Sequence, residues 1–167
     1  MNRLDTPPTL KRMQLDIIFL DIDGVLNPDK DNHPHVFAPE CVAQLQRILD
    51  AVPTAHVVFT TTWRVGFSFF ALGWLWRQHN LPLPRVIART PDIQVEKRGE
   101  EIQQWLKDAP RLAPKHKIGR YAILDDEPEP ILELIPKKHV FTCDPWHGLT
   151  DDVANRVICH LSGKNTL

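Results

Sequence analysis

The sequence contains few cysteines and almost no net charge, which argues against a disulfide-rich or zinc-binding protein and against a strongly basic one. Three cysteines, odd in number and far apart, form neither a disulfide framework nor a CxxC zinc pattern (Cys41, Cys143 and Cys159). With 20 Lys and Arg against 21 Asp and Glu, the net charge of −1 gives the whole chain no attraction to nucleic acid or membranes. We therefore expect reduced thiols and a cytoplasmic protein.

Long apolar runs are missing as well. No uncharged run approaches the roughly 18 residues that a transmembrane helix needs. The most hydrophobic stretch, FSFFALGWLW at 67–76, is typical of a buried helix or of a wall that faces substrate. The opening MNRLDTPPTLKRMQ is polar and contains proline, unlike a secretory signal. We expect no membrane association, and nothing in the sequence implies an obligate protein partner.

The residues that are present predict one α/β domain. A chain of 167 residues with 43% hydrophobic residues fits a single core. Short apolar runs alternate with helical patterns, which predicts a three-layer sandwich with a mostly parallel central sheet. Strands are expected at 15–20, 56–59, 85–88, 121–124 and 139–142, and helices from Pro39, at 67–79, at 100–108 and after an N-cap at Thr150. We expect a flexible leader over 1–13 and a single domain over 14–167.

Polar residues follow three of these strands at the point where each strand ends. They are Asp21 and Asp23, Thr60 to Thr62, and Asp125 and Asp126. In open α/β sheets, ligands bind beyond the carboxyl ends of the strands, so these groups are expected to share one crevice. Crowded carboxylates without Cys or His favour Mg²⁺, and a hydroxyl and a basic side chain beside them make a phosphate site.

The spacing within DIDG at 21–24 suits covalent catalysis. Side chains one and three of an extended segment point the same way, so Asp21 is able to attack phosphorus while Asp23 protonates the leaving group. Gly24 permits the turn that brings Asp23 near that oxygen.

These motifs resemble those of the haloacid dehalogenase (HAD) superfamily, in the family's order over roughly residues 15–130. DIDGVLN resembles its first motif, HVVFTTTWR its second, EKRGEEI the region of its third and ILDDE its acidic fourth. DIDGVLN, TTWR, RGEEIxxWL, ILDD and a later GLT together also resemble the small HAD domain of Swiss Army Knife RNA repair proteins.

The resemblance implies a role for each matching residue. Asp21 is then the nucleophile that accepts the phosphoryl group, and Asp23 is the general acid and base. The hydroxyl that binds the phosphoryl group is that of Thr60 or of Thr61, and both assignments stay open.

The basic and metal-binding positions follow from the same resemblance. Lys97 or Arg98 neutralises the charge of phosphate and nucleophile. Asp125 completes a Mg²⁺ site with the Asp21 carboxylate and the Asp23 backbone carbonyl, and Asp126 replaces or assists Asp125.

Other residues allow two interpretations. Arg64 is expected either to bind a substrate phosphate or to form a structural ion pair. His33 and His35 are either substrate contacts or plain loop histidines, and Trp74 and Trp76 are expected in the core rather than as base-stacking platforms. RLAPKHKIGR at 111–120 is expected to be a solvated basic loop, with nucleic-acid contact as the alternative.

The short connections indicate the substrate. The segments between Asp23 and Thr60 and between Thr60 and Lys97 leave no room for a cap domain. Uncapped HAD relatives act on macromolecular ends, so the resemblance implies a phosphorylated substrate such as a nucleic-acid end. A small phosphomonoester under a flap at 27–38, a phosphotransferase and a non-catalytic binding module are the alternatives.

Overall fold

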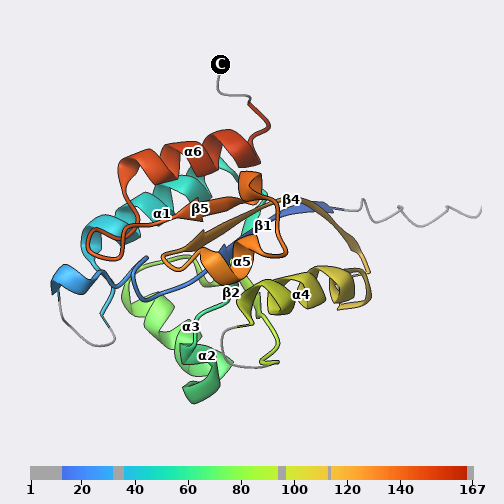
Figure 1. Cartoon of the computed structure of the whole chain (residues 1–167), viewed down its shortest axis with the longest axis horizontal. Helices are drawn as coiled ribbons and strands as arrows, with labels where there is room; N and C mark the ends of the chain where they lie inside the picture. The colour runs from blue at the N-terminus through green and yellow to red at the C-terminus, as the bar shows by residue number, and fades with distance from the viewer. Residues whose placement is uncertain (1–12, 32–35, 94–96, 113, 165–167) are drawn as a thin grey trace, which may run out of the picture.

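A computed structural model describes residues 13–31, 36–93, 97–112 and 114–164 of the chain. Five parallel strands form one sheet in the order β3-β2-β1-β4-β5. Helices follow the strands and form layers on both of its faces (Figure 1). The predicted α/β sandwich is confirmed, with a sheet that is parallel throughout the described residues.

The strands are β1 (Met13–Leu20), β2 (Ala55–Phe59), β3 (Val86–Arg89), β4 (His116–Asp125) and β5 (Val140–Thr142). The α-helices are α1 (Pro39–Ala51), α2 (Trp63–Gly66), α3 (Phe69–Gln78), α4 (Arg98–Leu112), α5 (Glu129–Leu132) and α6 (Asp151–Leu161). Short 3₁₀ turns lie at η1 (Asp29–Asp31), η2 (Leu83–Arg85) and η3 (Lys137–His139). As predicted, Pro39 begins α1, and the Thr150 side chain caps α6 by accepting from the Val153 N–H.

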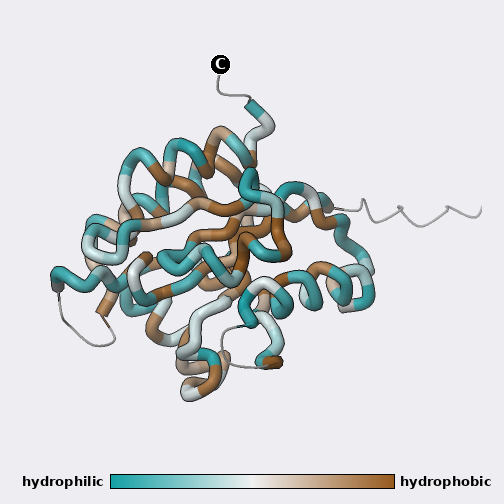
Figure 2. Tube along the Cα trace, viewed as in Figure 1, coloured by the Kyte–Doolittle hydropathy of each residue, from teal (hydrophilic) through white to brown (hydrophobic). Residues whose placement is uncertain are grey.

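The central strand β1 is buried on both faces, so its alternate residues enter two different cores. Ile18 and Leu20 pack with residues of α1, α3 and α6. Ile17 and Phe19 pack on the opposite face with residues of α4 and α5. Figure 2 shows the most hydrophobic segments gathered in these central strands.

Several predicted elements differ from the observed ones. The expected helix at 67–79 is present as α3, but a separate short helix, α2, precedes it, and Phe67 between the two has an extended backbone. The expected basic loop at 111–120 is wrong over its second half, since β4 starts at His116 and pairs with the start of β1. Trp76 is buried in the core as expected, whereas Trp74 is 58% exposed, which corrects its assignment to the core.

The connections that lead to the carboxyl edge of the sheet hold only short elements. Between Asp23 and Thr60 they are η1, α1 and β2, and between Thr60 and Lys97 they are α2, α3, η2 and β3. The described parts of both connections therefore contain no separate cap domain. None of the helices in the described ranges is both long and apolar enough to cross a membrane.

Candidate active site

The register of the sheet brings three polar residues together at its carboxyl edge. Leu20 of β1 is aligned with Phe59 of β2 and with Leu124 of β4. The residues that come next are Asp21, Thr60 and Asp125, held side by side by backbone bonds from Asp21 N to Leu124 O (3.0 Å) and from Thr60 N to Leu20 O (2.9 Å). Residues two positions earlier face α4, so these three side chains continue the α4 face of the sheet.

Arg98, the first residue of α4, completes the group. Its Nη1 donates to both Asp21 Oδ2 and Asp125 Oδ2. A Cβ at Gly99 would lie 2.6 Å from the Pro130 carbonyl oxygen, so glycine allows the start of α4 to approach this closely. Lys97 instead pairs with Glu100 at 2.9 Å on the exposed side of the helix.

Three carboxylates lie close enough to share a cation. Oxygen atoms of Asp21, Asp125 and Asp126 are all within 4.8 Å of one another. Burial and the nearby charge of Asp21 raise the pKa of Asp125 to about 7 and that of Asp126 to about 6. Burial alone would lower the pKa of Arg98, but the charges of Asp21 and Asp125 raise it above its ordinary value.

This group fits a divalent metal. If the three carboxylates are ionised, the single guanidinium leaves two negative charges, which Mg²⁺ would balance. All the ligand atoms are oxygens, as Mg²⁺ prefers. The side chain of Asp23 is not part of this cluster; the resemblance implies that Asp23 binds the metal through its backbone carbonyl.

The carboxylate of Asp23 is exposed beside the cluster. It accepts a hydrogen bond from Trp63 Nε1 at 2.7 Å and one from Asn27 Nδ2 at 3.1 Å. Gly24 has a φ of +65°, and a Cβ there would lie 2.3 Å from Asp126 Cγ. Only glycine therefore fits the turn that brings Asp23 and Asp126 near each other.

The two candidate threonines differ in their surroundings. Both are fully buried. The Oγ1 atom of Thr61 accepts the Trp63 N–H at 3.3 Å, whereas Thr60 Oγ1 has no hydrogen-bond partner among the described residues. A buried hydroxyl without a partner destabilises the folded state, so Thr60, whose oxygen neither donates nor accepts within the described ranges, has more capacity for a ligand than Thr61.

Arg64 supports this edge of the sheet from within. It forms an ion pair with Glu101 in which both side chains are buried. Its Nη1 also donates to the carbonyl oxygens of Thr60 (2.6 Å) and Thr61 (2.8 Å). Of the two roles expected for Arg64, the structure shows this structural ion pair.

Sequence reasoning missed the partners of these residues. In the sequence, Trp63, Asn27 and Glu101 lie within the motif stretches HVVFTTTWR, DIDGVLN and EKRGEEI, and no role is predicted for any of the three. The sequence shows two adjacent glutamates in the first turn of α4, and only the structure shows that Glu101 is the buried one that pairs with Arg64. His33 and His35 lie outside the described residues, as does part of the expected flap at 27–38.

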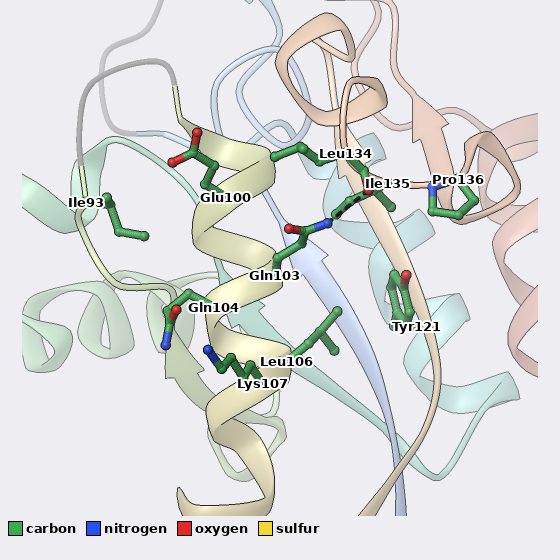
Figure 3. Close-up of a pocket in the computed structure, with 10 residues that line it drawn as sticks. All are labelled: Ile93, Glu100, Gln103, Gln104, Leu106, Lys107, Tyr121, Leu134, Ile135 and Pro136. Carbon is green, nitrogen blue, oxygen red and sulfur yellow. Dashed lines mark hydrogen bonds between the residues drawn. The ribbon is translucent and has the colours of Figure 1, made fainter.

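A separate groove crosses the outer side of α4 (Figure 3). The Gln103 amide donates to the Leu134 carbonyl within it at 3.0 Å. None of the cluster residues lines this groove, so it is separate from the acidic group.

Comparison with known proteins gives one finding. Residues 17–154 match the family described as the HAD domain in Swiss Army Knife RNA repair proteins. Neither the curated proteins nor the solved structures gave a match. The matched segment includes the whole acidic cluster and Arg98.

Proposed function

The chain belongs to the family of HAD domains found in Swiss Army Knife RNA repair proteins, and from this premise we propose that it is a Mg²⁺-dependent phosphatase for phosphomonoesters. The observation that carries the proposal is the acidic cluster bound to Arg98 beside the Thr60 hydroxyl, which has no hydrogen-bond partner within the described parts of the chain. A phosphoryl group can be bound at this edge of the sheet, because the guanidinium and the hydroxyl stabilise its oxygens and the carboxylates supply a nucleophile and metal ligands.

The first step is attack by Asp21 on phosphorus. One Asp21 oxygen forms a bond to phosphorus while the bond from phosphorus to the leaving oxygen breaks. Asp23 gives its proton to that oxygen, so the product leaves as an alcohol. The Ile22 N–H, which bonds Asp21 Oδ1 at 2.8 Å, and Arg98 on Oδ2 keep the nucleophile oriented.

The second step releases phosphate. Asp23, now ionised, takes a proton from a water molecule, whose oxygen attacks phosphorus as the bond to Asp21 breaks. Trp63 and Asn27 hold the Asp23 carboxylate at the exposed side of the site, where alcohol leaves and water enters.

The other side chains position the phosphoryl group. The Thr60 hydroxyl donates a hydrogen bond to a phosphoryl oxygen, and Arg64 holds the backbone of Thr60 and Thr61 in place. Arg98 neutralises charge as phosphorus approaches Asp21. Asp21, Asp125, Asp126 and the Asp23 carbonyl would hold Mg²⁺, which supplies charge stabilisation to the transferring group.

The substrate we propose is a phosphorylated nucleic-acid end. The family description names RNA repair proteins, and the described residues leave the site without a cap domain. An open site of this kind admits the end of a chain as readily as a small ester.

The test is phosphate release with Mg²⁺ or EDTA from an aryl phosphate and from 5′- and 3′-phosphorylated oligonucleotides. Activity is expected only with Mg²⁺ and only when Asp21 is intact, with Asp21→Asn as the control. Release by Asp21→Asn at the wild-type rate would refute the assignment of the nucleophile.

A silent wild-type protein that still binds Mg²⁺ would favour the binding-module alternative. Phosphate that appears on an added alcohol instead of in solution would favour the phosphotransferase.

A further inference from the structure

Large apolar side chains are exposed on α2 and α3, on one side of the proposed active site. Phe70 is 84% exposed and Trp74 58% exposed, and they lie four residues apart, so they are neighbours on the outer face of α3. Val65, Phe67 and Phe69 are also exposed in the same short segment. Figure 1 shows α2 and α3 next to each other. Such a concentration of exposed rings is unusual for a surface that only meets water.

This aromatic face is connected to the catalytic residues by direct contacts. Trp63, at the start of α2, donates to the Asp23 carboxylate at 2.7 Å. Its ring lies 5.9 Å from that of Phe67, measured between centroids. Trp63 and Phe67 therefore form a path from the proposed general acid into the segment that leads to α3.

The charge of the segment between Asp50 and Asp92 indicates which kind of ligand this face would bind. No Asp or Glu occurs between Asp50 and Asp92, a stretch that contains four arginines. Of these, Arg77 on α3 and Arg89 on β3 are exposed, and Arg89 donates to the carbonyls of Arg64 and Phe67. Flat apolar rings with cations and no acidic residues suit a ligand that has both aromatic faces and negative charge.

We propose that the aromatic face of Phe67, Phe70 and Trp74 binds the unpaired bases of a single-stranded nucleic acid whose terminal phosphate enters the site at Asp21. This rests on the proposed phosphatase function and names where its substrate binds. Bases of a single strand are free to stack on side chains, whereas those of a duplex are already stacked. Arg77 and Arg89 lie where the sugar-phosphate backbone of the strand passes.

The experiment separates binding from catalysis. Anisotropy of a fluorescein-labelled single-stranded RNA with a 5′-hydroxyl end is measured against the wild-type protein, Phe70→Ser and Trp74→Ser. Each substitution is expected to weaken binding roughly tenfold, the loss typical for one stacked base. Trp146→Ser is the matched control, because Trp146 is 57% exposed but lies outside the aromatic face; it should bind like wild type.

A second measurement links the face to turnover. The ratio of kcat/KM for the 5′-phosphorylated RNA to that for an aryl phosphate should fall roughly tenfold in Phe70→Ser and Trp74→Ser, mainly through KM. If the wild-type protein binds RNA through this face but hydrolyses no phosphate ester, the proposed phosphatase function is wrong and the proposed RNA-binding face is still supported.

Other occupants of the face give distinct results. Equal RNA binding by all variants would overturn the proposal, as would an equal loss in Trp146→Ser. Binding to phosphatidylserine vesicles that depends on Phe70 and Trp74, without RNA binding, would assign the face to membranes instead. A dimer that dissociates in these variants, again without RNA binding, would assign it to a second copy of the chain.

Discussion

Replacing Glu101 by Gln should destabilise the protein strongly, because it leaves Arg64 as a buried charge without its partner. The two side chains are 5% and 2% exposed, so water cannot replace the lost carboxylate. Breaking a buried pair from one side costs about 3–5 kcal/mol. For a chain of this size, that lowers Tm by roughly 6 to 20 °C.

The neighbouring residue provides a matched control. Glu100 is on the same turn of α4, but it is 44% exposed and pairs with Lys97 at 2.9 Å. Glu100→Gln should therefore change the free energy of unfolding by no more than about 1 kcal/mol. Thermal unfolding followed by circular dichroism compares the two variants under identical conditions.

A double variant separates folding from positioning. Arg64→Met with Glu101→Leu removes both charges, so it should be more stable than Glu101→Gln alone. Its phosphatase activity should stay low, because the Arg64 bonds to the carbonyls of Thr60 and Thr61 are gone. Equal Tm values for Glu101→Gln and Glu100→Gln would show that the buried pair stabilises the fold no more than the exposed one.

Three further predictions concern the site itself. Thr60→Val should raise the free energy of unfolding by about 1 kcal/mol in chemical denaturation, because the buried hydroxyl has no partner among the described residues. The same change should lower kcat/KM roughly tenfold to hundredfold, and unchanged kinetics would count against a role for Thr60 in phosphate binding. Gly24→Ala should cost at least about 1–2 kcal/mol and weaken Mg²⁺ binding in calorimetry, because φ is +65° and the new Cβ would meet Asp126; wild-type affinity would contradict this. In EDTA, the raised pKa of Asp126, about 6 against 3.8, means that the folded state holds a proton that the unfolded state loses, so stability should fall between about pH 4 and pH 6. In Asp126→Asn, stability measured by urea titration at each pH should fall less over this range, and an unchanged fall would argue against the raised pKa of Asp126.

The sequence was enough to predict which polar residues meet, because that depends on local patterns. Apolar runs ending in Asp21, Thr60 and Asp125 predict parallel strands, and parallel strands place their carboxyl ends at one edge. The register then puts these residues side by side without any further information.

Choices between neighbouring residues needed the structure. Lys97 and Arg98 are both cations, and only the start of α4, with the close approach at Gly99, determines which one meets Asp21. The pair of Arg64 with Glu101 joins residues on separate helices, which no local pattern reveals.

The sequence also could not predict which individual aromatic residues are buried. Trp74 and Trp76 lie in one apolar run, but two positions along a helix is more than half a turn. Trp76 therefore enters the core while Trp74 faces outward. The hydrophobicity of the run says nothing about which side of the helix the sheet covers.

If Asp21 carries the phosphoryl group during turnover, that group can be trapped on its side chain. Wild-type protein turning over an aryl phosphate with Mg²⁺ is quenched in acid, digested and analysed by mass spectrometry. We predict that the peptide containing Asp21 gains the mass of one phosphoryl group, and that Asp21→Asn never does. Rapid turnover with no modified peptide, or with the phosphoryl group on another residue, would contradict the account.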